Sequence, residues 1–237
     1  MTILYDNVPY REGLQTAWGY ACLVETGQAT LLFDTGGHGP TLLANMTALD
    51  VDPAAIDLVV LSHIHADHTG GLAGLLAAGA QPMVYLLASF PEEFKNEVAS
   101  QTVVVEVTGP AEILPGVYTT GGLGEGLVEQ GLVVQTAEGN VVITGCAHPG
   151  VVRMVRAAQQ IAGQEVALVM GGFHLEDADQ AQIERVIKDL RGLGVQRVAP
   201  SHCTGDRARR AFAEAFGEVY LPAGAGWTIT VGSPART

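Results

Sequence analysis

The sequence His63-Ile64-His65-Ala66-Asp67-His68 directly follows the apolar run Leu58–Leu61. That run is short and rich in valine, so it predicts a buried strand that ends where the histidines begin. Ligand-type side chains massed at the end of a strand are costly to order unless something binds them, and a divalent metal is the usual partner. His63 and His65 can face the same way on an extended chain, whereas Asp67 and His68 follow at a turn. The cluster therefore predicts a metal site with donors for a second ion.

The alternative is a surface turn that is rich in histidine by chance. It is disfavoured because three of the seven histidines of the chain lie in these six positions. Further along, three more apolar runs are each followed by small residues and then by histidine, at His148, His174 and His202. Ligand sites of α/β sheets form beyond the carboxyl ends of strands, so these side chains can converge. One such histidine alone would more often be structural, but the set favours a metal centre.

The composition of the whole chain is that of a well-buried α/β protein. Its 237 residues are 48% hydrophobic and 16% charged, which excludes a disordered chain. The formal net charge of −13 argues against nucleic acid as substrate, because binding a polyanion requires lysine and arginine. One local basic group can still hold a small anion. We therefore expect a small-molecule substrate, anionic ones included.

The chain carries no recognisable targeting or membrane segment. It begins without a basic and then apolar leader, and its longest apolar region, 72–88, is interrupted by glycines and a proline. The odd number and wide spacing of Cys22, Cys146 and Cys203 predict no disulfide framework. We therefore expect a cytoplasmic protein with no membrane partner.

Short apolar strands alternate with amphipathic helices, and no linker divides them. This pattern predicts one domain over residues 1–237, of the α/β (α+β) class, in which two sheets with helices outside form a four-layer αββα sandwich. Each half starts with a hairpin. The expected strands are 19–25, 29–33, 57–61, 83–87, 102–107, 132–136, 141–144, 166–170, 197–199 and 227–231, and the expected helices are 40–49, 71–78, one from Pro91, 150–161, 178–190 and 208–216.

The motifs together resemble the metallo-β-lactamase superfamily, whose signature is H-x-H-x-D-H. Within it the chain is similar to the branch labelled dihydropteroate-synthase-related or dihydropterin-ribofuranosylaminobenzene-phosphate synthase-like. The resemblance spans nearly the full chain, and its motifs follow in the order of that family: 33–37, 62–72, 145–150, 171–174 and 201–205. It implies the metallo-β-lactamase fold.

The resemblance also implies a ligand set. His63, His65 and His148 would hold one metal, and Asp67, His68 and His202 the other. Two zinc ions would share a hydroxide aimed at an electrophilic substrate atom, with Asp67 and His68 part of the catalytic centre. Three protein ligands for each ion leave a position open for water. Iron and manganese are the alternative metals.

Several positions around this set stay open. Many superfamily members add a metal-bridging aspartate in a Gly-Asp pair that ends a later strand, and no expected strand of this chain ends in such a pair. Cys146 or His148 could replace it, and His174 could be a ligand or a substrate contact. Cys146 and Cys203 could instead be buried small residues. We expect Asp34 to orient a ligand through hydrogen bonds.

Two basic features could face the substrate. His38 could reach it, although a surface loop position is the simpler interpretation. The arginines that follow Ser201–Gly205, at positions 207, 209 and 210, could bind a phosphate or carboxylate at a helix N-terminus, or form a solvated face. The glycine-rich loop 116–129 carries no decisive chemistry, so the sequence does not identify the substrate, nor the oligomeric state.

The resulting functional hypothesis is a metal-dependent, dinuclear zinc hydrolase of a small molecule. The alternatives are an iron-dependent oxidoreductase, a transferase related to pterin biosynthesis, and a non-catalytic metal-binding module. Glutamate at the place of His65 is typical of the di-iron branch, so the imidazole favours zinc. A nuclease is opposed by the acidic balance of the chain.

Overall fold

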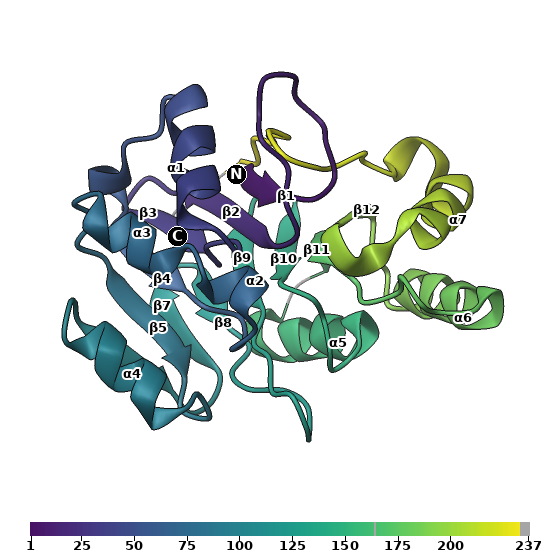
Figure 1. The fold of residues 1–237 in the computed structure, drawn as a ribbon. Helices are drawn as coiled ribbons and strands as arrows, with labels where there is room; N and C mark the ends of the chain where they lie inside the picture. Colours follow the sequence, from purple (N-terminus) through teal and green to yellow (C-terminus); the bar gives the residue numbers. More distant parts are fainter. Residues whose placement is uncertain (164, 233–237) are drawn as a thin grey trace. The chain divides into compact units, whose positions relative to one another are not determined.

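The computed structural model describes residues 1–163 and 165–232 (Figure 1). The chain divides into two compact units, which are described separately. Unit 1 comprises Met1–Thr108 and Gly224–Thr230. Unit 2 comprises the described residues of Gly109–Ala223 together with Val231 and Gly232.

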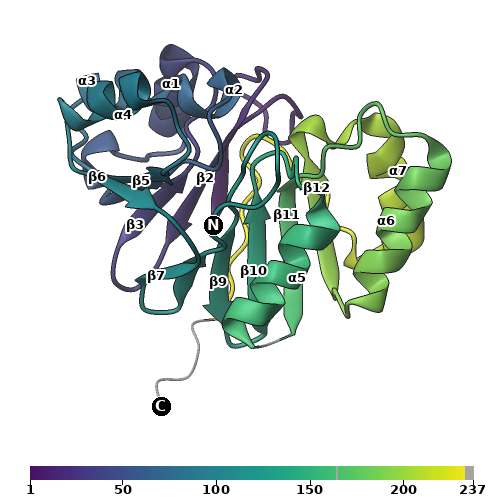
Figure 2. The same ribbon diagram turned by 90° about the horizontal axis from the view of Figure 1, so that it is seen from below.

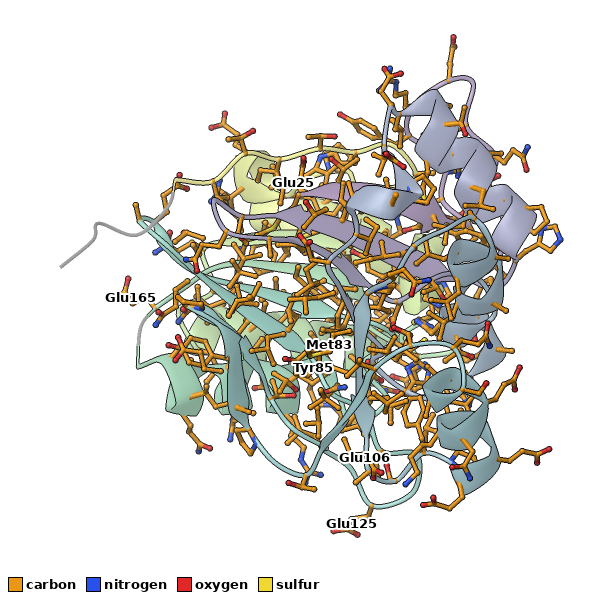
Figure 3. All side chains as sticks on the ribbon, turned by 90° about the vertical axis from the view of Figure 1, so that its left-hand side faces the viewer. Glu25, Met83, Tyr85, Glu106, Glu125 and Glu165 are labelled. Carbon is orange, nitrogen blue, oxygen red and sulfur yellow. The ribbon has the colours of Figure 1, made fainter. Side chains whose placement is uncertain are left out.

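Unit 1 is built on a six-stranded mixed sheet in the order β1-β2-β3-β4-β5-β6. The first three strands are antiparallel, and the strands from β3 to β6 run parallel. On β5, fully buried Val84 and Leu86 alternate with half-buried Met83 and Tyr85. Met83 and Tyr85 are labelled in Figure 3. The strands are β1 Thr2–Asp6, β2 Tyr20–Glu25, β3 Thr30–Phe33, β4 Leu58–Val60, β5 Met83–Leu87 and β6 Val104–Val107.

Helices α1, α3 and α4 lie on one face of this sheet (Figure 2). Helices α1 and α3 approach closely because glycines meet at the contact: a Cβ on Gly39 would lie 3.1 Å from Cα of Gly74. The short helix α2 carries the second half of the histidine cluster. The helices are α1 Gly39–Ala48, the 3-10 turn η1 Pro53–Ala55, α2 Ala66–Thr69, α3 Leu72–Ala77 and α4 Glu92–Ala99.

Unit 2 contains a second six-stranded sheet in the order β12-β11-β10-β9-β8-β7. Strands β10, β11 and β12 are parallel, so their carboxyl ends meet at one edge. The remaining pairs are antiparallel. The strands are β7 Ala111–Leu114, β8 Val117–Thr119, β9 Leu132–Thr136, β10 Gly139–Thr144, β11 Val166–Gly172 and β12 Arg197–Ser201.

Helices α5, α6 and α7 cover one face of the second sheet (Figure 2). Their apolar stripes bury Val142, Val169 and Val198 of the strands, and the Phe173 and Phe212 rings meet edge to face at 5.4 Å. The helices are α5 Val151–Ala162, α6 Gln180–Gly192 and α7 Asp206–Phe216, with 3-10 turns η2 His202–Thr204 and η3 Gly217–Val219.

The α/β class and nearly all of the expected elements are confirmed. The expected strand over 227–231 is wrong, because this segment forms an isolated bridge, Thr2↔Thr228, and no ladder. Residues Gly139 and Asn140, which lie between the expected strands 132–136 and 141–144, belong to β10. Strands β1, β7 and β8 were not predicted. No helix in the described part of the chain is long and apolar enough to cross a membrane.

Candidate metal centre

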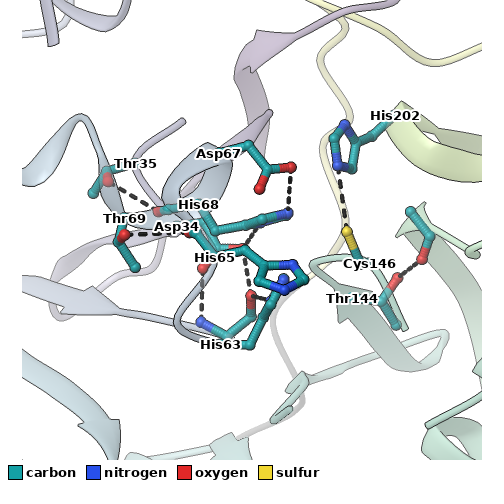
Figure 4. Close-up of polar contacts among 12 residues, drawn as sticks. Asp34, Thr35, His63, His65, Asp67, His68, Thr69, Thr144, Cys146 and His202 are labelled. Atoms are coloured by element: carbon teal, nitrogen blue, oxygen red, sulfur yellow. Dashed lines mark hydrogen bonds and ion pairs between the residues drawn. The ribbon is translucent and has the colours of Figure 1, made fainter. Parts of the chain in front are cut away.

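The donors of unit 1 gather where β4 runs into α2. His63 is fully buried, His65 is the exposed N-cap of α2, and Asp67 and His68 lie in its first turn. The His63 ring centroid lies 4.8 Å from that of His65 and 4.2 Å from that of His68. Nε2 of His68 is 3.4 Å from the Asp67 carboxylate (Figure 4). The structure thus brings together the four side chains that the motif predicted.

Asp34 holds two residues of this loop, Ser62 and His68, in place through hydrogen bonds. It is fully buried, has a φ of 58°, and its carboxylate accepts hydrogen bonds of 2.7 Å from both the backbone N–H and the hydroxyl of Ser62. The same carboxylate lies 2.7 Å from Nδ1 of His68 (Figure 4). Ser62 Oγ is in turn 2.9 Å from Nδ1 of His63. Both buried imidazoles are therefore held at Nδ1, which makes Nε2 the atom that a metal would take.

The electrostatics of His68 follow from that contact. Burial opposes protonation of the ring, but the charge and hydrogen bond of Asp34, together with Asp67, outweigh it and raise the pKa of His68 to about 10. In the absence of a metal, the ring is therefore an imidazolium at neutral pH. Two carboxylates that attract a cation to this position favour a metal ion there as well.

Backbone contacts fix the position of the loop. The backbone N–H and the hydroxyl of Thr35 both donate to the His68 carbonyl, at 2.8 and 2.9 Å. Gly71 donates to the Gly36 carbonyl at 3.0 Å, and a Cβ on Gly71 would lie 2.9 Å from the carbonyl carbon of Thr35. A glycine is required here because the segment after β3 touches the backbone of the donor loop.

Unit 2 gathers a second set of donors beyond the ends of β10, β11 and β12. Sγ of Cys146 lies 3.4 Å from Nε2 of His202 (Figure 4), and the rings of His148 and His174 are 4.2 Å apart. One donor atom each from Cys146, His174 and Cys203 lies within 4.8 Å of the other two. The three strand-end histidines are thus brought together with two thiols.

The buried carboxylate of Glu129 holds the loop that carries Cys146 and His148. It accepts hydrogen bonds of 2.8–2.9 Å from three consecutive backbone N–H groups, those of Cys146, Ala147 and His148. Ala147 has a φ of 61°, a conformation that these hydrogen bonds help to hold. Sequence reasoning missed Glu129. The available signal was a lone acidic residue immediately before an apolar strand, which is weak.

Cys203 and His174 form an acid–base pair in unit 2. The Cys203 thiol contacts Cys146 and His174. These contacts hold the pKa of Cys203 well below its usual range, although burial opposes this. The hydrogen bond to Cys203 raises the pKa of His174, against partial burial. An acidified thiol beside an imidazole is a donor set that suits a soft or borderline metal such as zinc.

Two further sequence expectations can be placed. Nδ1 of His38 lies 3.0 Å from the Thr41 hydroxyl at the start of α1, which supports the simpler interpretation of a loop residue. Arg207 donates to the Ala178 carbonyl, and Arg209 pairs with Asp206 in the first turn of α7 at 3.2 Å. Because both arginines bond to other groups of the protein, these contacts argue against the anion site.

The donor chemistry of the two clusters fits divalent metal ions. Unit 1 supplies imidazole and carboxylate, and unit 2 supplies imidazole and thiol, which are the ligand types of zinc sites. Backbone strain marks the same segments: Asp34, Ala147, His174 and His202 have φ between 49° and 61°. Such strain is concentrated at functional positions in folded proteins.

Comparison with known proteins places these clusters in context. Residues 19–202 match the model of the metallo-beta-lactamase superfamily. The chain is 31% identical to 7,8-dihydropterin-6-methyl-4-(beta-D-ribofuranosyl)-aminobenzene-5'-phosphate synthase of Methanocaldococcus jannaschii, over 92% of this chain and 91% of the relative.

Solved structures with the same fold cover almost the whole chain. The crystal structure of Tm1679, a metal-dependent hydrolase of the beta-lactamase superfamily, matches with a TM-score of 0.82 and 28% identity, covering 98% of each chain. The metallo-beta-lactamase fold protein YhfI of Bacillus subtilis matches with a TM-score of 0.68 at 16% identity, covering 95% of this chain and 96% of that one. The second likeness concerns the fold alone.

Proposed function

Because the chain belongs to the metallo-beta-lactamase superfamily, in the branch of the Methanocaldococcus jannaschii synthase, we propose that it is a metal-dependent hydrolase of a small molecule. The observation that carries the proposal is the buried Asp34–His68 pair at 2.7 Å. A carboxylate behind a histidine fixes the ring and strengthens it as a metal ligand. Burying such a pair is costly for a protein that has no use for it.

We propose the ligand sets that the family resemblance implies. His63, His65 and His148 would hold one zinc ion, and Asp67, His68 and His202 the other. His174 and Cys146 are the candidates for the bridging position, with Cys203 beside them. A bound zinc ion supplies Lewis acidity and makes water a nucleophile near neutral pH. Iron or manganese in these sets would change the chemistry.

The residues of the chain itself would then position the reaction. Asp34 holds the proton of His68 on Nδ1, so that Nε2 faces away from it. Asp67 is half-buried and can accept a proton from water. His174 is exposed, so it can contact a substrate without prior movement. Glu129 sets the direction of the Cys146–His148 loop.

Metal analysis and turnover test this function together. We expect close to two equivalents of zinc in the purified protein, and hydrolysis of an ester or phosphodiester reporter that a chelator abolishes and zinc restores. Asp67→Ala should lose turnover, because it removes a proposed ligand, while circular dichroism shows an unchanged fold. Metal-free protein, or no metal-dependent turnover on any reporter, would contradict the proposal. Iron with oxygen consumption would instead support the oxidoreductase.

The second candidate is a synthase related to pterin chemistry. The 31% identity to the Methanocaldococcus jannaschii synthase over 92% of the chain favours it. A synthase should join a dihydropterin that carries a leaving group on its 6-methyl carbon to a ribofuranosyl-aminobenzene phosphate. Mass spectrometry of the products separates the two functions: a joined product supports the synthase, and release of the leaving group to water alone supports the hydrolase.

A further inference from the structure

Two of the three cysteines of the chain lie side by side in unit 2. Cys146 and Cys203 are 4% and 5% exposed, and their sulfur atoms lie within 4.8 Å of each other. Sγ of Cys203 is also 3.5 Å from the carbonyl oxygen of Cys146. A disulfide requires about 2.05 Å between sulfurs, so the two sulfur atoms must move closer before they can bond.

The register of the sheet explains why these residues meet. Strand β11 lies between β10 and β12, with Thr144 opposite Gly171 and Gly172 opposite Ser201. Cys146 lies two residues after Thr144, and Cys203 lies two residues after Ser201, so both follow closely after the ends of the strands that flank β11. Adjacent strands are about 4.8 Å apart, so side chains on flanking strands do not normally touch across a middle one.

Gly172 removes the obstacle between them. A Cβ at this position would lie 2.7 Å from Sγ of Cys203 and 3.1 Å from Cα of Cys146. The space that a side chain would fill is therefore the space in which the Cys203 sulfur sits. Gly172 has no positive φ, so its φ does not require a glycine here. The close approach of the Gly145 carbonyl oxygen and of the two cysteines does require one.

We propose that Cys146 and Cys203 are a modification site: a dithiol that a hydroperoxide converts reversibly to a disulfide. One thiol attacks hydrogen peroxide, the O–O bond breaks, and a sulfenic acid and one water form. The second thiol attacks that sulfur and releases another water. The two sulfurs lose two electrons, the peroxide gains two, and both thiol protons leave in the water.

The disulfide would alter the donor set of unit 2. Turning Sγ of Cys146 toward Cys203 takes it away from Nε2 of His202, now 3.4 Å distant. His148 and His202 follow and precede the linked residues in the sequence, so their rings would be displaced as well. This consequence rests on the proposed metal site, but the cross-link itself does not.

The test uses the full-length protein, reduced and treated with a chelator so that no metal shields a thiol. Hydrogen peroxide should consume two of its three thiols, and dithiothreitol should restore them. Trypsin cleaves at Lys95, Arg153, Arg197 and Arg207, so the non-reduced digest should contain peptide 96–153 joined to 198–207. Cys22→Ala should still form this link. Cys203→Ala should lose it.

Three results would overturn the proposal. The first is retention of all three thiols under conditions that oxidise dithiothreitol. The second is conversion of Cys146 and Cys203 to sulfinic acids with no cross-linked peptide. The third is a link that includes Cys22. Because the wild-type peptide map decides among these results, the conclusion holds even if a variant folds poorly. A protein without hydrolase activity but with the cross-link would leave this site intact and reject only the proposed function.

Discussion

At the scale of single residues, one buried carboxylate organises the donors of each unit. The carboxylate of Asp34 accepts hydrogen bonds from Ser62 and is paired with Nδ1 of His68. The carboxylate of Glu129 accepts hydrogen bonds from three backbone N–H groups of the Cys146–His148 loop. The first acts on a ligand ring and the second on the backbone that carries donors. Substitution at the two positions should therefore have different effects.

Asp34→Asn should lower the metal affinity of the protein strongly, with a smaller effect on its free energy of unfolding. The amide keeps the shape of the side chain and can still accept from Ser62, but it removes the charge beside His68. Loss of such an outer carboxylate costs about 10–100-fold in metal affinity. Competition with a chromophoric chelator measures this affinity. Glu25→Gln, an exposed carboxylate change in the same unit, is the control. Equal affinities for Asp34→Asn and wild type would contradict the role.

Glu129→Gln should destabilise the fold by about 2–4 kcal/mol. The amide retains one acceptor oxygen, and its NH₂ group faces a backbone N–H, so at least one buried donor loses its partner. Urea denaturation measures the free energy of unfolding. Glu138→Gln, which removes an exposed ion pair with Arg197 in the same unit, should cost below about 1 kcal/mol. Similar losses for both variants would reject the special role of Glu129.

Cys22 should make the protein sensitive to alkaline pH. Burial in β2 raises the pKa of this thiol from 9.0 to about 11, in spite of the nearby N-terminal charge. Between these values the folded chain keeps a proton that the unfolded chain releases, so stability falls as pH rises. From about pH 8 to about pH 10.5 the loss is about 2 kcal/mol.

The variant Cys22→Ala tests this contribution, because it removes the thiol and leaves the other ionisable groups in place. Its free energy of unfolding should be lower than that of the wild type at about pH 8, since the substitution leaves a small cavity. The difference from wild type should narrow as the pH rises. A difference that stays constant would show that Cys22 is not the titrating group.

At the scale of elements, the apolar pattern predicted those strands and helices whose burial is regular. Strand β5 and helix α1 match the expected ranges to within a residue. Strands β7 and β8 were not predicted, because half-exposed residues and Gly116 leave their short segments without a clear alternation of apolar and polar residues. Segment 227–231 alternates apolar and polar residues like a strand, but it forms an isolated bridge to β1 instead of a ladder. The donor residues were predictable from strand ends, whereas Glu129 depends on a loop path that no local pattern encodes.

Gly71→Ala should disturb the junction between β3 and the donor loop. Its Cβ would press on the backbone of Thr35, 2.9 Å from the carbonyl carbon, and Thr35 holds the carbonyl of His68. We expect a loss of about 1–3 kcal/mol in the free energy of unfolding. Gly192→Ala, where a Cβ meets nothing within 4 Å at the end of α6, should instead be neutral or gain up to about 1 kcal/mol. Equal effects would contradict the close approach.

At the scale of the whole molecule, the chain returns to its beginning. Segment 224–230 belongs to unit 1, although all of unit 2 except its last residues precedes it in sequence. It clasps the N-terminus: Ile3 N–H donates to the Trp227 carbonyl at 2.9 Å, and Gly226 N–H donates to the Ile3 carbonyl at 2.8 Å. Trp227 is 6% exposed. The first unit is therefore complete only when the last part of the chain is in place.

A chain that ends at Ala223 should be less stable by at least about 3 kcal/mol. It loses the burial of Trp227, and removing a buried tryptophan side chain costs about 3–5 kcal/mol. It also leaves the backbone groups of Ile3 without the partners they have here. Circular dichroism during urea denaturation measures the loss, and hydrogen exchange should show β1 as the element that loses protection first. A chain that ends at Gly232 keeps the whole segment and is the control. Equal midpoints for the two truncations would mean that unit 1 folds without its C-terminal clasp.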